Sequence, residues 1–302
     1  MDNITVCACT YRRPDGLLEL LESLKSLQIP TGTQVQFCVI DNDVSASASD
    51  VVNSVAVDFP QPLRYIHEPK PGIPSARNRA LLEAGTDGFA VFVDDDETVD
   101  SQWLVELYRV AKETGGAFVQ GPVEMTVEDV TDKWWLDTSM FRQKVFADGS
   151  PRHESWTNNV MIDMAFISRT GCRFDDSLRF DGGSDTLFFQ DVIRQGGTGF
   201  FAAHALVFEV QPKSRLTWRW AIQRQYRYGI TRANSVVLRQ WRPRAMVYCL
   251  VRGVAMYACG LGFLVAALYR GRTGMADGVA YLARGTGAVS YTHLTLPTTP
   301  YV

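Results

Sequence analysis

The feature that most constrains this sequence is the stretch from Phe89 to Glu97, in which five apolar residues run directly into three aspartates and a glutamate. A short apolar run bounded by turn residues is typical of a strand buried on both faces, as in a parallel sheet. The acidic side chains then lie at the carboxyl end of that strand, which is where open α/β sheets bind their ligands. We therefore expect a ligand site at Asp94 to Glu97.

Four carboxylates at one strand end repel one another unless a cation neutralises them. Their hard oxygen atoms suit Mg²⁺ or Mn²⁺. Such an ion is usually shared with the phosphates of a substrate rather than enclosed by protein alone. The cluster therefore predicts a nucleotide-dependent transferase. A solvated acidic turn after a strand is the alternative that these residues leave open.

Strands and helices alternate on both sides of this stretch. Further strands are predicted at 4–9, 36–40, 63–66, 117–123 and 156–162. Helices are predicted from Pro14, near 46–55, at 75–84, from Ser101 and at about 186–195. This alternation predicts an α/β fold with a doubly wound, mostly parallel sheet.

Polar clusters follow three of the predicted strands at their carboxyl ends: Thr10 to Arg13, Asp41 to Asp43, and Asp94 to Glu97. Because parallel strands end at the same edge of a sheet, we expect these clusters to form one site. Further along, Gly182-Gly183-Ser184-Asp185 precedes a predicted helix. Asp185 at that helix N-terminus would be stabilised as an anion and could act as a general base, whereas a simple N-cap by Asp185 or Ser184 is the structural alternative.

Taken in order, these motifs and the segment Gly72 to Asn78 resemble those of family 2 inverting glycosyltransferases of the GT-A fold. The resemblance covers the first 210 residues. It implies a Rossmann-like nucleotide-binding half, an acceptor half, and transfer of a sugar from a nucleotide diphospho-sugar with inversion of configuration.

The resemblance also implies roles for particular residues. Asp41 would contact the base, Arg77 the diphosphate, Asp96 the metal, and Asp185 would take the proton of the acceptor hydroxyl. The full set assigned to the donor nucleotide is Thr10, Tyr11, Arg13, Asp41, Arg77, Asp94 and Asp95. Thr10 and Tyr11 would line the nucleoside pocket, and Asp94 would contact the ribose or sugar.

One position departs from the family pattern, because Ser184 stands where members commonly carry Glu. This bears on the acceptor side of the site, to which Ser184 and Asn159 are assigned. Asn159 follows Asn158 where the family often places an Asn, and an amide that stabilises a turn is the other interpretation of this position.

The C-terminal part of the chain differs in charge from the rest. From Lys213 onward thirteen Lys or Arg face one acid, Asp277, and residues 253–269 form an uncharged run. The run has the minimum length for a spanning helix, and arginines flank both of its ends. We expect interfacial or re-entrant membrane attachment, with a true span and a buried helix as alternatives. The flanking arginines could also hold the diphosphate of a polyprenyl-linked acceptor.

Residues 209–229 resemble the tail of the subgroup that builds succinoglycan-type exopolysaccharide on a lipid carrier. The segment Gln223 to Tyr228 resembles the Gln-x-x-Arg-Trp motif of processive synthases, but its spacing differs and Tyr228 replaces Trp. We therefore expect addition of a single sugar. The predicted division is a catalytic domain at 1–210, a helical and membrane-associated region at 211–289, and a non-native tail at 290–302, whose composition resembles translated adapter sequence.

Two rival functions remain open in the sequence. Asp94-x-Asp96 followed by Thr98 fits the signature of haloacid-dehalogenase-type phosphatases, with Asp94 as nucleophile. A non-catalytic nucleotide-sugar-binding protein is the other rival, supported by Ser184.

The preferred function is transfer of a hexose, from a UDP-sugar donor, to a lipid-linked or glycan acceptor at the cytoplasmic face of the membrane. Six cysteines without a CxxC pair and an N-terminus that enters a strand directly favour that compartment. No nucleic-acid-binding motif is found.

Overall fold

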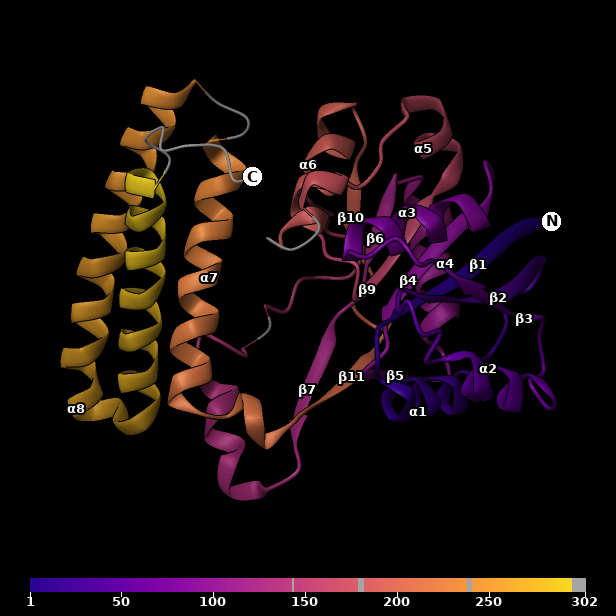
Figure 1. Cartoon of the computed structure of the whole chain (residues 1–302), viewed down its shortest axis with the longest axis horizontal. Coiled ribbons are helices and arrows are strands. Elements are labelled where there is room, and N and C mark those ends of the chain that lie inside the picture. Colours follow the sequence, from indigo (N-terminus) through magenta and orange to yellow (C-terminus); the bar gives the residue numbers. More distant parts are fainter. Residues whose placement is uncertain (143, 179–181, 238–240, 295–302) are drawn as a thin grey trace. The chain divides into compact units, whose positions relative to one another are not determined.

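The computed structural model describes residues 1–142, 144–178, 182–237 and 241–294, apart from the side chains of Arg242 and of residues 291–294. The chain forms two compact units (Figure 1). Residues 1–124 and 143–209 form the α/β unit, and residues 125–142 and 210–302 form the helical unit. The segment 125–142, expected inside the catalytic domain, packs with the helical unit. The functional division at residue 210 stays a prediction.

An eight-stranded sheet organises the α/β unit, in the order β3-β2-β1-β4-β9-β6-β10-β8. Its strands are β1 (Asp2–Thr10), β2 (Thr33–Asp41), β3 (Leu63–His67), β4 (Phe89–Asp94), β6 (Phe118–Gln120), β8 (Pro151–Arg152), β9 (Asn159–Asp163) and β10 (Gly199–Phe201). The first four in space are parallel, β9 runs against β4 and β6, and β10 is parallel to β6. The predicted α/β class with a mostly parallel sheet is confirmed.

The sheet is buried on both faces, as the sequence of β4 predicts. Val91 and Val93 enter one apolar cluster, with Leu17 and Leu20, while Phe92 enters the other. This alternation follows from the two-residue period of a strand. The covering helices are α1 (Pro14–Leu24), α2 (Ser49–Ala56), α3 (Ile73–Ala84), α4 (Trp103–Thr114), α5 (Met164–Thr170) and α6 (Ser184–Arg194).

Two local predictions differ from the structure. The single strand expected at 117–123 is two strands, β6 and β7 (Val123–Val127), which belong to different sheets. Gly121 and Pro122 separate them, and a proline cannot donate to a central ladder. The helix expected from Ser101 is α4, which begins two residues later at Trp103, with Gln102 at its N-cap.

A smaller sheet in the order β5-β11-β7 is formed by β5 (Glu97–Val99), β11 (Val207–Gln211) and β7. β11 runs antiparallel to β5 and pairs Glu209 with Glu97. β5 begins three residues after β4 ends, so the acidic turn lies between strands of the two sheets.

The helical unit contains η1 (Val130–Asp137), η3 (Lys213–Arg215), α7 (Trp218–Val237) and α8 (Arg242–Leu294). α8 breaks at Gly271, whose φ of 57° and ψ of −137° are not helical. We call residues 242–270 the first arm and 272–294 the second arm; they run side by side as a hairpin (Figure 1). Backbones approach closely where glycines face each other, and a Cβ on Gly285 would lie 3.2 Å from the Gly253 carbonyl oxygen.

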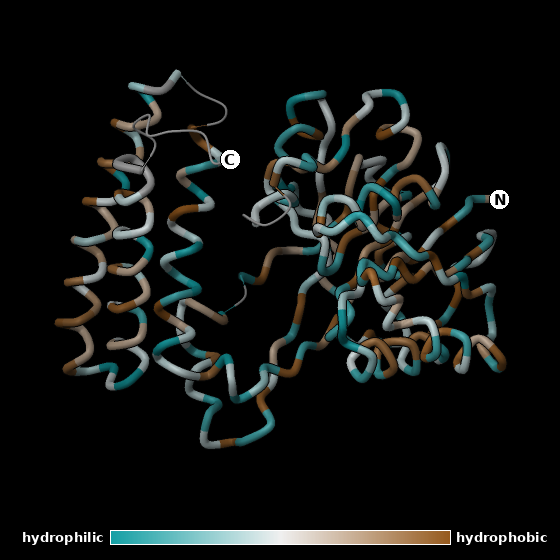
Figure 2. The backbone as a smooth tube through the Cα atoms, viewed as in Figure 1, coloured by the Kyte–Doolittle hydropathy of each residue, from teal (hydrophilic) through white to brown (hydrophobic). Residues whose placement is uncertain are grey.

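Within the described residues, one helix, Pro243–Ser290, is long and apolar enough to cross a membrane. This test considers length and composition, and the break at Gly271 divides the helix into the two arms. Apolar residues run along most of the first arm, whereas the second arm is mixed and α7 is more polar (Figure 2). The apolar C-terminal helix that the sequence predicted is present.

Candidate functional site

Strand register brings the predicted polar clusters to one edge of the large sheet. Cys9 pairs with Asp94 in the β1–β4 ladder, and Thr10 pairs with Asp41 in the β1–β2 ladder. All three strands are parallel, so their carboxyl ends share this edge. Thr10, Asp41 and Asp94 therefore lie on neighbouring strands, and the turns that follow these strands all begin at this edge of the sheet.

Arg13 and Thr10 hold the acidic turn from the side of β1. The Thr10 hydroxyl donates to Asp95 at 2.8 Å, and the Arg13 guanidinium contacts Asp95 at 3.0 Å and Asp96 at 2.8 Å. α1 approaches so closely that a Cβ on Gly16 would lie 2.8 Å from the Asp95 carbonyl oxygen. Burial raises the pKa of Asp95, and the bonds from Thr10 and Arg13 oppose that rise.

A strained turn places these groups. Arg12 has a φ of 55°, which a residue with a Cβ rarely adopts. Its guanidinium lies over the Tyr11 ring, 5.0 Å from the centroid, and bonds to Asp43 at 3.1 Å. Tyr11 itself is 53% exposed. The turn thus presents an exposed aromatic ring and directs Arg13 toward the acids, and stored strain of this kind is common at functional sites.

Asp94 lies among several other acidic side chains. Its pKa is raised to about 7, mainly by burial; Asp96, Asp95 and Glu209 contribute to this rise, and Arg77 opposes it. The backbone N–H of Asp94 donates to Glu97 at 2.9 Å. Glu97 is buried, and burial beside Asp94 raises its pKa well above the usual range. A bound cation would favour the ionised form of these acids.

Arg77 connects the acidic turn to the start of α6. Its guanidinium donates to the Ser184 hydroxyl at 3.2 Å, and its charge acts on Asp94. Gly183 precedes α6 with a φ of 82°, a left-handed conformation that favours glycine. Asp185, the next residue after Ser184, lies in the first turn of α6 and is partly buried. The hydrogen bond to Ser184 therefore brings Arg77, the residue predicted to bind the diphosphate, close to the start of α6, where the predicted base Asp185 lies.

Asp41 is fully buried and bonds within its own loop. It accepts hydrogen bonds from the backbone N–H groups of Asp43 and Ala48, at 2.9 and 2.8 Å, and from the Tyr65 hydroxyl at 3.0 Å. Burial and the bond to Asp41 raise the pKa of Tyr65 to about 12. Asp41 thus shapes the turn after β2, and its predicted contact with a base stays a prediction.

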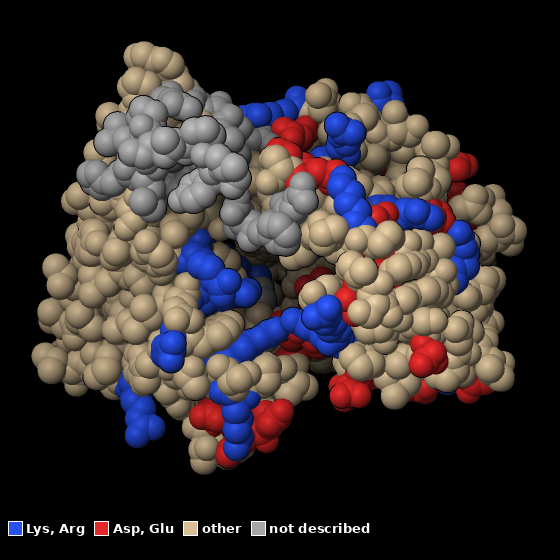
Figure 3. Space-filling model, viewed as in Figure 1, with Lys and Arg blue, Asp and Glu red and all other residues tan. Residues whose placement is uncertain are grey.

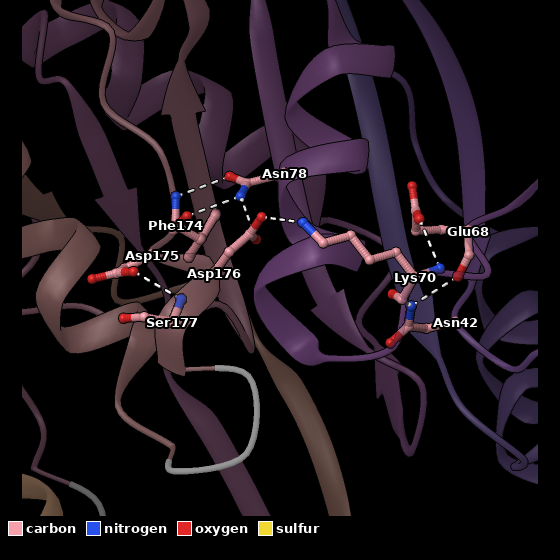
Figure 4. A network of polar contacts seen from close by, with 8 residues as sticks. All are labelled: Asn42, Glu68, Lys70, Asn78, Phe174, Asp175, Asp176 and Ser177. Carbon is pink, nitrogen blue, oxygen red and sulfur yellow. Dashed lines mark hydrogen bonds and ion pairs between the residues drawn. The ribbon is translucent and has the colours of Figure 1, made fainter. Parts of the chain in front are cut away.

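Two asparagines that sequence reasoning did not single out hold the loops around the site (Figure 4). Asn42 donates to the carbonyl oxygens of Glu68 and Lys70, and it accepts from Gly72 at 2.9 Å. It therefore fixes the loop that leads into α3. Asn42 and its flanking aspartates form a turn-like cluster after a strand, the one signal in the sequence that could have indicated this role.

Asn78, on α3, holds the second of these loops. Its side chain donates to the carbonyl oxygen of Phe174 at 2.9 Å and accepts from the backbone N–H of the same residue at 2.9 Å. It also bonds to Asp176, which pairs with Lys70 (Figure 4). The 3₁₀ turn η2 (Asp176–Leu178) is thereby joined to α3. Within the described chain, this segment is the last before Gly182 and the start of α6.

Asn159 lies at the start of β9 and is fully buried, which does not suit the contact with the acceptor that was predicted for it. It accepts a hydrogen bond from the Trp103 indole N–H at 2.8 Å, and it donates to the carbonyl oxygens of Pro122 and Ala205, both at 2.8 Å. These bonds join β9, α4 and the segments before β7 and β11. They favour the structural interpretation, and the acceptor contact stays a prediction.

Comparison with known proteins decides the family. The sequence profile of "Glycosyl transferase family 2" matches residues 5–173. The chain is also 36% identical over 230 residues to the succinoglycan biosynthesis protein ExoM of Rhizobium meliloti (strain 1021), a match covering 76% of this chain and 74% of that protein. The chain belongs to glycosyltransferase family 2.

Solved structures confirm the GT-A fold of this family 2 chain. The mannosyltransferase PcManGT from Pyrobaculum calidifontis has a TM-score of 0.60 at 16% identity, covering 94% of this chain and 86% of that chain. Residues 1–349 of S. aureus TarS give a TM-score of 0.55 at 15% identity, covering 97% of this chain and 92% of that chain. Membership of family 2 disfavours the phosphatase that the Asp94-x-Asp96 spacing left open.

The acidic turn of this family 2 chain fits a shared divalent ion. Among the described residues, no group of three or more His, Cys, Asp or Glu side chains is arranged to hold a metal ion. Asp96 is 29% exposed at its side chain, and it bonds to Arg13. A partly exposed carboxylate beside further acids suits Mg²⁺ or Mn²⁺ that completes its coordination with substrate phosphates and water.

Proposed function

We propose that this chain transfers a single sugar from a nucleotide diphospho-sugar, with a UDP-hexose as donor, to a lipid-linked or glycan acceptor in exopolysaccharide synthesis. The relative ExoM is named for succinoglycan biosynthesis. A structural neighbour, S. aureus TarS 1–349, has been solved with UDP, at a TM-score of 0.51, and PcManGT with GDP-Man and Mn²⁺. These names support a nucleotide-sugar donor and a metal for this chain.

The observation that carries the proposal is the path from Asp96 to Asp185. Arg13 contacts Asp96, Asp96 and Asp95 lie beside Asp94, and Arg77 joins the surroundings of Asp94 to Ser184. A diphosphate held by Arg77 would thus lie between the metal-binding acid and the first turn of α6. Guanidinium groups suit this task, because their forked donors match phosphate oxygens.

The reaction that this arrangement supports is a single displacement. Asp185 takes the proton of the acceptor hydroxyl as its oxygen attacks the anomeric carbon. The bond between that carbon and the diphosphate breaks on the opposite face, so the configuration inverts and the nucleoside diphosphate leaves with the electron pair. Arg77 stabilises the negative charge that develops on the departing phosphate.

Asp96, with Asp94 beside it, would hold Mg²⁺ or Mn²⁺. When bound, the ion acts as a Lewis acid toward the diphosphate. Thr10 and Arg13 both bond to the Asp95 carboxylate, and Arg13 also bonds to Asp96, so the ion would share the Asp96 carboxylate with Arg13. Thr10, Tyr11 and Asp95 contribute to the donor pocket in this proposal, and Asp41 shapes its base end.

The apolar first arm of α8 attaches the chain to a membrane in this proposal, at its cytoplasmic face. Large apolar side chains of the first arm are strongly exposed, among them Val254, Leu261 and Leu268. Exposed apolar surface of this extent marks an interaction site. A membrane location suits an acceptor that is itself attached to a lipid.

The test is release of UDP from a panel of UDP-sugars with Mn²⁺, with and without a membrane lipid extract. We expect release that needs both metal and acceptor in the parent and that is lost in Asp96→Ala and Asp185→Asn. A parent that binds UDP-sugar but never releases UDP would favour the non-catalytic binding protein. Asp185→Asn with full activity would refute the assigned base.

A further inference from the structure

Two arginines lie at the same level of the hairpin in the helical unit, and neither is paired with a carboxylate among the described ion pairs. Arg252 lies on the first arm of α8 and Arg284 on the second. Their neighbours Gly253 and Gly285 are in close backbone contact, which sets the two arginines at the same level of the hairpin. A Cβ on Gly229 of α7 would lie 2.2 Å from the Arg284 carbonyl oxygen, so Arg284 is at the contact of three helices. Burial lowers the pKa of Arg284 overall; the charge of Arg252 acts on Arg284 in the same direction, while Asp277 acts on it in the opposite direction.

The hydrogen bonds of both arginines go to neutral groups. Arg284 donates to the side-chain oxygen of Gln225 and to the carbonyl oxygen of Ser139, the latter at 3.5 Å. Arg252 donates to the Tyr248 hydroxyl at 3.2 Å. Its Nε is buried and has no hydrogen-bond partner among the described residues.

The acid nearest to this pair is already engaged. Asp277 lies two turns before Arg284, pairs with Arg270 at 3.2 Å, and accepts the backbone N–H of Ser139. It is the one acidic residue of α7 and α8 in the sequence. On α7, the exposed Arg224 bonds to the Tyr228 hydroxyl at 3.0 Å.

Like charges in apolar surroundings are costly unless an anion compensates them. A buried donor without a partner adds to that cost and calls for an explanation. Phosphate is the anion that best matches two guanidinium groups, because each can donate a pair of hydrogen bonds to its oxygens.

The surface around Arg252 indicates which kind of chemical group is linked to the phosphate. Arg252 is the one ionisable residue apart from Tyr and Cys between Met246 and Tyr269, and its neighbours Leu250, Val251 and Val254 are exposed. The atoms over α8 are almost entirely uncharged in Figure 3, as far as that view shows them. A ligand that meets both features carries a phosphate and a long hydrocarbon chain.

We propose that Arg252 and Arg284 bind the phosphate of a lipid phosphate or diphosphate whose hydrocarbon chain lies along the exposed apolar side of the first arm. The assignment of this lipid as the carrier of the sugar acceptor rests on the proposed function, whereas the binding itself does not. On α7, Tyr228 lies near enough to act on Arg284, and Arg224 donates to the Tyr228 hydroxyl.

The experiment measures binding of farnesyl diphosphate to the full chain by calorimetry, in EDTA so that no metal recruits the diphosphate to the acidic turn. Inorganic pyrophosphate and farnesol are titrated in parallel. We expect farnesyl diphosphate to bind the parent and to bind Arg252→Gln at least tenfold more weakly. Arg272→Gln, which removes an exposed charge near the break in α8, is the matched control and should bind as the parent does.

Arg284 is tested as Arg284→Lys, because its bonds to Gln225 and Ser139 hold the bundle together. We expect partial binding in this variant. Equal affinity of the parent and Arg252→Gln would overturn the site, and so would an equal loss in Arg272→Gln. Pyrophosphate binding as tightly as farnesyl diphosphate would refute the lipid.

UDP-sugar binding with Mn²⁺, measured on the same preparations, separates the two proposals. A parent that binds UDP-sugar but not farnesyl diphosphate refutes the lipid site and leaves the transferase intact. A parent that binds farnesyl diphosphate through Arg252 but no UDP-sugar supports the site and removes its link to sugar transfer.

Discussion

Replacing Asn159 by Ala distinguishes two hypotheses for this residue: that it stabilises the fold through buried hydrogen bonds, and that it contacts the acceptor. The substitution removes three buried hydrogen bonds of 2.8 Å and leaves the Trp103 indole N–H and the carbonyl oxygens of Pro122 and Ala205 without partners. A buried hydrogen bond contributes about 1 kcal/mol net, so the loss of three costs about 3 kcal/mol of unfolding free energy. With a typical urea m-value, the unfolding midpoint falls by about 1 M or more.

The assay pairs urea unfolding, followed by circular dichroism, with steady-state kinetics at 15 °C, where the folded fraction of the variant remains high. We expect a lower midpoint for Asn159→Ala, and an unchanged KM for the acceptor per folded molecule. Asn158→Ala is the control, because Asn158 is the adjacent amide and only Asn159 makes these three bonds. An unchanged midpoint together with a raised acceptor KM would refute the structural reasoning and support the acceptor contact.

Three further perturbations test the site. Asp96→Ala should abolish the thermal stabilisation that Mn²⁺ plus UDP confers on the parent, since the shared ion loses its carboxylate ligand; a retained shift in differential scanning fluorimetry would place the metal elsewhere. Gly16→Ala places a Cβ 2.8 Å from the Asp95 carbonyl oxygen, so we expect about 1 kcal/mol of destabilisation and weaker UDP binding, compared with Gly262→Ala, where nothing lies within 4 Å. Finally, the hydrogen bond from Lys70 lowers the pKa of Asp176, so the contribution of this pair to stability is present above about pH 4 and is lost as the pH falls through the lowered pKa. Because both side chains are about half exposed, Lys70→Met should remove about 0.5 kcal/mol at pH 7 and less as the pH falls through the lowered pKa, as measured by urea unfolding.

The sequence predicts the centre of the α/β unit well because β4 carries its whole signal locally. Its residues are apolar on both faces and the acids follow at once, so both the buried strand and the site at its end can be recognised. The sequence of β9, in contrast, carries no local signal that tells in which direction this strand runs. A buried strand has the same composition whether it runs parallel or antiparallel to β4, and the pairing is decided by how the chain returns to the sheet.

The candidate site shows the same limit at the level of side chains. Motifs select Asp94 to Asp96 as a group, but they do not tell that Asp95 turns inward to Thr10 and Arg13 while Asp96 stays partly exposed. They also give no role to Asn78, whose partners lie 96 and 98 residues away in the chain. Hydrogen bonds over such separations depend on the tertiary fold and leave no pattern in one sequence.

The helical unit shows how a single backbone conformation changes the interpretation of a composition. In the sequence, the uncharged run at 253–269 indicates one helix that attaches to a membrane at its interface or as a re-entrant segment, with a span or a buried helix as alternatives, and Arg252 is then a charge at its edge. The break at Gly271 folds the second arm back, so that Arg284 lies at the level of Arg252 rather than about 48 Å further along a continuous helix, at 1.5 Å per residue. Two arginines that are unrelated in the sequence thereby become one cationic site beside an apolar surface, which is the arrangement that a lipid phosphate requires.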